Sequence, residues 1–94
     1  MKFNWDERKN QINQHKHGVS FEQACYAFAD PYQLNIQDND LDYGEERWVL
    51  LGKTEQHGLL VVVHIEVHDN EIRIISARTA TKHEQKVYEQ RRLP

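Results

Sequence analysis

The sequence predicts an α+β fold with two N-terminal helices, an antiparallel β-sheet of four to five strands and one C-terminal helix. Three observations predict it: two helix-cap signals with helical spacing near the N-terminus, four strand-like segments in the middle, and another cap signal near the C-terminus. The 94 residues contain no repeat, low-complexity tract or Pro/Gly-rich linker. We therefore expect a single domain over residues 1–94.

The N-terminal part is expected to hold a brief strand and a polar helix. Phe3 and Trp5 flank Asn4 in a short alternating piece. Asp6 can cap a surface helix over residues 7–17, and Gly18 can end it in the left-handed conformation.

A second helix is expected to open with a capping box of Ser20 and Gln23. Asp30 and Pro31 should stop it, because the residue before a proline disfavours the helical conformation. Its apolar face holds Phe21, Ala24, Cys25 and Phe28 at helical spacing.

Four strands and a last helix follow. The strand candidates are residues 32–38, 46–53, 59–68 and 71–77, with the acidic loop DNDLDYG after the first. Asp69 and Asn70 tolerate positive φ and fit a two-residue turn between the last two strands. Thr81 and Glu84 form a second capping box, which opens a helix running to about Arg91.

The last hairpin carries ionisable residues where a plain strand would continue with Val and Ile. Alternation places Val61, Val63, Ile65 and Val67 on the core face and Leu60, Val62, His64, Glu66 and His68 on the other. A two-residue turn would bring His64, Glu66 and Arg73 together on one polar face. A three-residue loop would shift the register by one residue and break this cluster.

The residues of this cluster can have structural roles instead of a functional one. Glu66 and Arg73 can be a cross-strand ion pair, and His64 can be a partly buried histidine with a hydrogen-bond partner. His64, Glu66 and His68 could also converge on a metal ion, but their spacing is not the helical H-E-x-x-H and no cysteine cluster supports them. We expect no metal and no cofactor.

Composition excludes several classes of protein. The chain is 38% hydrophobic and 29% charged, as in a globular domain, and no stretch has the roughly 18 consecutive apolar residues that a membrane span needs. Cys25 is the single cysteine, so no intramolecular disulfide can form. With no apolar leader at the N-terminus, these features favour a cytoplasmic protein that is not associated with a membrane.

Charge is unevenly distributed along the chain. Residues 1–70 carry 6 Lys/Arg and 12 Asp/Glu, a balance of −6, and residues 71–94 carry 6 and 3, a balance of +3. The basic end can attract phosphate and the acidic part can receive a basic partner, although scattered solvated charges would give the same counts.

Ordered motifs along the chain resemble a known family. They are W-D-x-x-K-x-x-x-N-x-x-K-H-G-V-S-F-E-x-A from Trp5 to Ala24, G-E-E-R from Gly44 to Arg47, the run Leu59 to His64, R-I-I-S-A-R-x-A-T from Arg73 to Thr81, and E-x-x-x-Y-E from Glu84 to Glu89. Together these motifs resemble the BrnT family of bacterial type II toxins, over nearly the whole chain.

The resemblance implies a fold, an activity and partners. It implies a RelE-like ribonuclease that cleaves RNA without a metal, through attack of a ribose 2′-OH on the adjacent phosphate, and so arrests translation. It also implies a BrnA-like antitoxin that neutralises the toxin and makes the contact with operator DNA, and a possible homodimer within their complex. The acidic loop at Leu41–Tyr43 departs from the family pattern and leaves substrate preference open.

The reaction needs a base, an acid and cations, which suggests candidate residues. The catalytic candidates are His17, Glu46, His64, Arg47, Arg73 and Arg78, with Lys16, Lys82 and Lys86 as RNA-binding candidates. Arginine suits phosphate through its forked donors and permanent charge. Each candidate also has a structural reading: His17 can stabilise the end of the first helix, and Arg78 can brace the last one.

Strand parity puts Arg73 and Arg78 on opposite faces unless the chain bends near Ser76. We expect the site on the sheet face of the last strands, rimmed by the first and last helices. The alternative function is a non-catalytic module that binds an antitoxin-like partner and assists repression of its operon.

Overall fold

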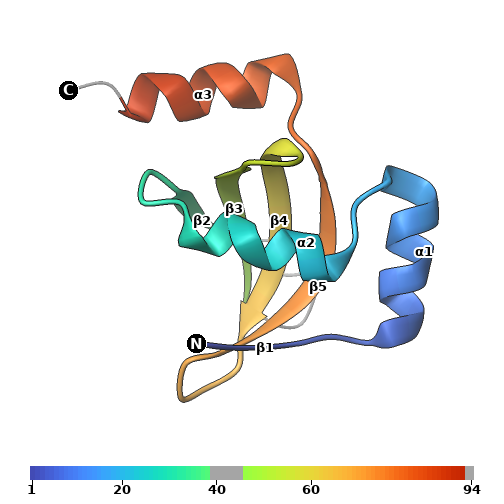
Figure 1. Cartoon of the computed structure of the whole chain (residues 1–94). Helices are drawn as coiled ribbons and strands as arrows, with labels where there is room; N and C mark the ends of the chain where they lie inside the picture. Colours follow the sequence, from blue (N-terminus) through green and yellow to red (C-terminus); the bar gives the residue numbers. More distant parts are fainter. Residues whose placement is uncertain (39–45, 93–94) are drawn as a thin grey trace.

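The computed structural model describes residues 1–38 and 46–92 and contains a five-stranded sheet with helices on both faces (Figure 1). The elements in chain order are β1 (Lys2–Asn4), α1 (Glu7–His17), α2 (Phe21–Cys25), the 3₁₀ helix η1 (Tyr26–Ala29), β2 (Leu34–Asp38), β3 (Arg47–Thr54), β4 (Gly58–Glu66), β5 (Glu71–Thr79) and α3 (Lys82–Arg92). The expected α+β class and element order are confirmed. Most of the predicted acidic loop lies outside the described residues.

The strands are ordered β1-β5-β4-β3-β2. β2 to β5 form an antiparallel meander, as expected, whereas β1 pairs with β5 in the parallel direction. The parallel pairing requires a long crossover, and here the chain between β1 and β5 contains the N-terminal helices and strands β2, β3 and β4. None of the described helices is long and apolar enough to cross a membrane.

The helix boundaries follow the predicted caps. The Asp6 side chain accepts hydrogen bonds from the Arg8 and Lys9 backbone N–H groups, and Gly18 ends α1 at φ 72°. The capping box of Ser20 and Gln23 is complete, but α2 tightens into η1 after Cys25. The helical face predicted for 21–28 is therefore shared by two short helices.

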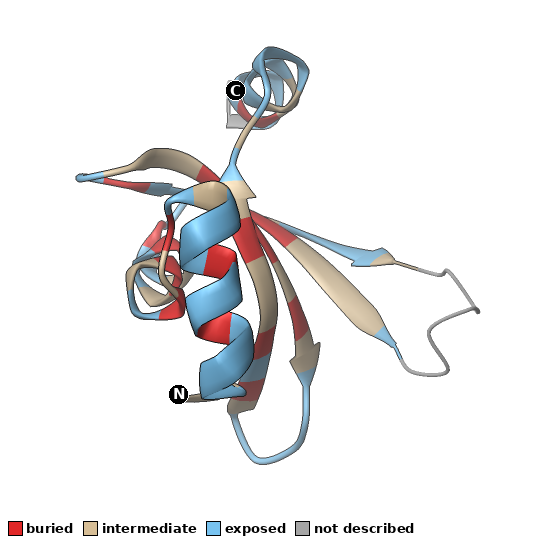
Figure 2. Ribbon diagram, turned by 90° about the vertical axis from the view of Figure 1, so that its right-hand side faces the viewer, coloured by how far each residue is buried: buried red, intermediate tan, exposed pale blue. Residues whose placement is uncertain are grey.

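One face of the sheet is covered by α1, α2 and η1, except at the edge strand β2, and we call it the covered face (Figure 2). Its core combines Phe21 and Ala24 of the helix layer with buried residues of β3, β4 and β5, among them Leu50, Leu60, Val62, Ile74 and Ala77. The prediction of which face of β4 points into the main core is wrong, because Leu60, Val62 and His64 point there. Val61 is also buried, but on the opposite side, against Leu51 and Tyr88 of α3.

The loop between β4 and β5 is three residues long. Val67 N–H donates to the Glu71 carbonyl at 3.0 Å, and Asp69 and Asn70 adopt the expected positive φ values of 49° and 67°. Ile65 pairs with Arg73, and Glu66 pairs with Ile72. The predicted cluster of His64, Glu66 and Arg73 is therefore wrong, since one extra loop residue moves every partner by one position.

A β-bulge lies farther along the same strand pair. Val63 pairs with Ser76 and His64 with Ile74, which leaves Ile75 as the extra residue on β5. The extra residue in the bulge offsets the odd spacing between Arg73 and Arg78, so both residues lie on the same sheet face. This is the bend near Ser76 on which the parity argument depended.

Candidate functional site

The second face of the sheet is covered by α3 at one end and carries no other described helix, as Figure 2 shows. We call it the open face. α3 reaches Leu51 and Val61 through Tyr88. Beyond that contact the strand register sets an apolar stripe, Ile36, Val49 and Val63, which ends at Ser76.

A polar row follows the apolar stripe across all five strands. Asp38 pairs with Arg47, Ile65 pairs with Arg73, and Asn4 pairs with Arg73 from the other side. Arg47 precedes the Trp48–His64 pair by one residue, so the register places it beside Ile65. Only one strand separates Arg47 from Arg73, which puts their backbones about 10 Å apart, within reach of two arginines that share one phosphate.

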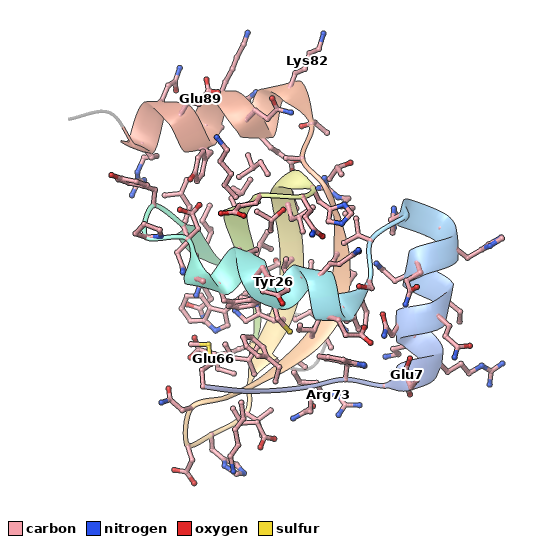
Figure 3. The ribbon with its side chains drawn as sticks, in the orientation of Figure 1. Glu7, Tyr26, Glu66, Arg73, Lys82 and Glu89 are labelled. Carbon is pink, nitrogen blue, oxygen red and sulfur yellow. The ribbon has the colours of Figure 1, made fainter. Side chains whose placement is uncertain are left out.

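Arg73 is an exposed cation held by a neutral group. Its Nη1 donates to Asn4 Oδ1 at 3.2 Å, and Asn4 Nδ2 donates to Glu71 Oε2 at 2.6 Å. Figure 3 shows Arg73 beside β1, at the end of the molecule away from α3. The remaining guanidinium donors can therefore face solvent or a ligand.

Glu46 and Arg47 lie at the start of β3, with Glu46 exposed and Arg47 half-buried. Both belong to the G-E-E-R motif, whose first two residues are outside the described part of the chain. Glu46 is thus a solvent-accessible carboxylate next to a cation of the polar row. Its position along the chain makes Glu46 a candidate for proton transfer near a bound phosphate.

Arg78 braces the last helix. Its Nη1 and Nη2 donate to the two carboxylate oxygens of Glu84, each at 2.8 Å. The guanidinium hydrogen bonds hold the pKa of the Glu84 carboxyl at about 2, and the same carboxylate completes the predicted capping box with Thr81. Arg78 shares the open face with Arg73, but its charge is balanced by Glu84.

A second contact fixes α3 through a carboxylate that sequence reasoning did not single out. Asp30 Oδ2 accepts from the Tyr88 hydroxyl at 2.5 Å and from the Lys53 backbone N–H at 2.8 Å, and Oδ1 accepts from Tyr32 N–H. The sequence signal was present in Asp30-Pro31 and in the E-x-x-x-Y-E motif, but the two segments are far apart along the chain. Only the fold joins them.

His64 lies in the core of the covered face, not on a polar face. It is fully buried, and its ring packs edge-on against Phe28 with 4.9 Å between the two ring centroids. Its Nδ1 lies 3.3 Å from the Val62 carbonyl oxygen. Burial lowers the pKa of His64, so the neutral ring is favoured at neutral pH. In this position the ring cannot contact RNA.

The other basic candidates are distributed over both helical layers. His17 is half-buried in the last turn of α1, on the side of the covered face, and Lys16 beside it is exposed. Lys82 and Lys86 are exposed on α3, and Figure 3 shows Lys82 pointing away from the sheet. The structure therefore brings Arg47 and Arg73 onto one sheet face, with Glu46 next to Arg47 along the chain, and does not bring His17 or His64 to them.

Within residues 1–38 and 46–92, no three His, Cys, Asp or Glu side chains are grouped as metal ligands. His68 is in the loop and lies 3.4 Å from Asp69, away from the buried His64. Burial raises the pKa of the Cys25 thiol to about 11, which makes it a poor nucleophile.

A cleft of about 780 Å³ lies at the far end of the sheet, between η1, the β3–β4 turn and α3. Its lining includes Tyr26, Tyr32, Lys53, His57 and Tyr88, and none of the candidate residues. Arg47 and Lys53 lie six residues apart on β3, so the cleft is about 20 Å from the polar row. The cleft and the polar row are separate features.

The polar row places two forked cations, the exposed Arg73 and the half-buried Arg47, on the open face, an arrangement suited to binding a phosphate. Asn4 and Glu71, which sequence reasoning missed, are part of this arrangement. The signal for Asn4 was its position between Phe3 and Trp5, where alternation points it away from the core.

Comparison with known proteins identifies relatives of the chain. A family model described as "Ribonuclease toxin, BrnT, of type II toxin-antitoxin system" matches residues 5–84. Among solved structures, the chain resembles the Brucella abortus ribonuclease toxin BrnT with a TM-score of 0.68 and 24% identity, over 87% of this chain and 99% of that one. The structural likeness shows a common fold. No curated protein matches the chain.

Proposed function

The chain belongs to the BrnT family of ribonuclease toxins of type II toxin–antitoxin systems, and from this premise we propose that its open face cleaves RNA without a metal ion. The observation that carries the proposal is the row in which Arg47 and Arg73 flank Ile65, on the part of the open face beyond the contact with α3. Phosphate recognition by paired arginines fits a ribonuclease of this family.

The reaction is a transesterification. A base removes the ribose 2′-OH proton, the 2′-oxygen bonds to phosphorus, and the bond from phosphorus to the 5′-oxygen breaks. The leaving 5′-oxygen takes a proton from solvent, and the products carry a 2′,3′-cyclic phosphate and a 5′-OH. Arg47 and Arg73 would stabilise the charge that builds on the phosphorane oxygens.

Glu46 is the base in this proposal. It is exposed and adjacent to Arg47, whereas His64 is buried and His17 lies on the helix layer of the covered face. Arg78 acts chiefly through Glu84 and α3, and Lys16, Lys82 and Lys86 add non-specific attraction for the RNA backbone. A positioned base contributes about 10²–10⁴-fold to such a rate.

The test is RNA cleavage by purified protein with EDTA present. We expect cleavage to persist, and the product ends to be 2′,3′-cyclic phosphate or 3′-phosphate. Arg73→Gln should lower kcat/KM about 10- to 100-fold, since a hydrogen bond to a charged group contributes about 1.5–3 kcal/mol. Lys53→Gln is the matched control, because it removes an exposed cation of the same sheet far from the polar row.

Two results would contradict the proposal. One is cleavage that stops with EDTA and returns with a divalent metal. The other is equal loss of activity in Arg73→Gln and Lys53→Gln, which would indicate that only overall charge matters.

We also propose that a BrnA-like antitoxin neutralises this toxin in the cytoplasm. DNA would be contacted only through the antitoxin, and two toxin chains could form a homodimer within the complex. The apolar stripe supports a binding surface, because Ile36 is 51% exposed at the edge strand and continues into Val49 and Val63.

The same stripe favours a second candidate function, a non-catalytic interaction module. Co-purification with the product of an adjacent gene should be weakened by Ile36→Glu and unaffected by Gln11→Glu on α1. Tight binding together with no RNA cleavage would put the interaction module first.

A further inference from the structure

We propose that Asn4 is a positioning residue for Arg73: its amide, fixed by Glu71, holds the guanidinium on the open face without neutralising its charge. The proposal rests on the proposed function, in which Arg73 binds the RNA phosphate. It assigns a role to β1, the three-residue strand that pairs with β5 in the parallel direction.

The Asn4 side chain is hydrogen-bonded to both Glu71 and Arg73. Lys2, Phe3 and Asn4 pair with Glu71, Ile72 and Arg73 in register, so the Asn4 side chain stands beside both Glu71 and Arg73. Nδ2 donates to Glu71 Oε2 at 2.6 Å, and Oδ1 accepts from Arg73 Nη1 at 3.2 Å. Each side of the amide thus has one partner of the correct polarity.

Glu71 determines which way the amide faces. A carboxylate accepts hydrogen bonds only, so it selects the NH₂ side of Asn4 and turns the carbonyl oxygen towards Arg73. With the amide reversed, NH₂ would face a guanidinium that has donors alone, and both hydrogen bonds would be lost. The short 2.6 Å contact therefore orients the longer 3.2 Å contact.

The neutral amide leaves the charge of Arg73 available. A carboxylate at position 4 would also accept from Nη1, but it would form an ion pair and compete with phosphate for the same cation. Arg78 shows this alternative in the same strand, because Glu84 binds it through both carboxylate oxygens. An arginine that must bind a ligand and an arginine that braces a helix thus have different partners.

The decisive variant exchanges the acid and the amide. Asn4→Asp combined with Glu71→Gln keeps the net charge of the chain and keeps a donor and an acceptor at each contact, while moving the negative charge next to Arg73. We expect its melting temperature to stay near that of the wild type. Its affinity for phosphate should fall about tenfold or more, which corresponds to 1.4 kcal/mol.

Affinity is measured with a single-stranded 2′-O-methyl RNA oligonucleotide, which lacks the attacking hydroxyl, by fluorescence anisotropy at several salt concentrations. Losing one phosphate contact should reduce the salt slope by about 0.7. Gln11→Glu, an amide-to-acid change on exposed α1, is the matched control for Asn4→Asp and should leave the slope unchanged. Arg73→Gln defines the full effect of losing the contact.

The inference is supported if the exchange variant is folded and shows the salt slope of Arg73→Gln. It is overturned if that variant binds and cleaves like the wild type, and the proposed ribonuclease function then still stands. If the wild type cleaves no RNA but binds the oligonucleotide through Arg73 and Asn4, the proposed function fails and the inference holds. If the wild type does not bind the oligonucleotide, both fail.

Discussion

The two faces of the sheet use polar residues in opposite ways. On the covered face they are buried: Asn13 is hydrogen-bonded to the backbone of Ala77, and His64 is held neutral in the core, where its Nε2 has no hydrogen-bond partner among the described residues. On the open face they remain accessible, and Arg73 keeps most of its donors free of protein acceptors among the described residues.

This difference separates structure from function better than residue type does. Histidine is the usual acid or base of a ribonuclease, yet here its position under Phe28 gives it a packing role. An exposed arginine looks unremarkable in the sequence, yet the register places it in a row with a second arginine. The predictions below test whether the covered face determines stability and the open face activity.

The largest expected effect is on the covered face, at Gly52. A Cβ atom there would lie 2.3 Å from the Ala27 carbonyl oxygen, so Gly52→Ala should force η1 away from β3 and cost about 3 kcal/mol or more. Chemical denaturation of purified protein measures this loss. Gly18→Ala is the control, since position 18 has space for a Cβ and only its φ of 72° resists, at about 1–2 kcal/mol. Equal losses at both positions would contradict the close approach.

Asn13 should have the next largest effect. Its Nδ2 donates to the Val19 and Ala77 carbonyls, each at 2.8 Å, and its Oδ1 accepts from Ala77 N–H at 3.2 Å. Asn13→Ala leaves these buried groups without partners and should cost about 2–3 kcal/mol in urea unfolding. Asn35→Ala, at an exposed position of β2, should stay within about 0.5 kcal/mol. A small loss at Asn13 would show that water replaces the amide.

A smaller effect is expected for the pair of Arg78 and Glu84. Glu84→Gln keeps the capping box but loses the ion pair, and should cost about 0.5–1 kcal/mol at pH 7, because the pair is partly exposed.

The cost should also depend on pH. The folded pKa of about 2 is below the ordinary value of 4.5, so the stabilisation is complete above pH 4.5 and is lost as pH falls towards 2. Unfolding curves of both proteins between pH 6 and 2.5 should therefore converge at the acid end. Parallel curves would mean that the difference in stability does not come from the charge of the Glu84 carboxylate.

The smallest expected effect on stability is at Arg73. Its side chain is exposed and has one hydrogen bond, so Arg73→Gln should change the free energy of unfolding by less than about 0.5 kcal/mol. The same variant should lose most RNA cleavage. A thermal melt beside a cleavage assay makes the comparison, and a large drop in melting temperature would place Arg73 among the structural residues.

Local signals predicted most of the fold. Asp6, Ser20 and Thr81 start helices where they were expected, since a cap needs only partners within three residues. The predicted loop of the hairpin was one residue too short. Asp69 and Asn70 tolerate positive φ in turns of more than one length, so their presence did not fix the length of this loop. The extra loop residue separated His64 from Arg73.

The candidate site was predicted in part. Arg47 and Arg73 were both candidates, but their common row depends on the pairing of β3, β4 and β5. Arg78 proved to be bound to Glu84, a contact that the capping box did not reveal. Asn4 and Glu71 were missed because they lie far apart in sequence and meet only through the parallel pairing of β1.

The sequence by itself determined the caps, the order of the elements and the alternation of the strands, since these depend on neighbouring residues. Only the tertiary structure decided which face each strand turned to the helices, where the bulge placed Arg78, and which polar groups met across the sheet. The physical reason is that burial and cross-strand pairing act between residues distant in the chain, and one residue of register reverses the face of every side chain.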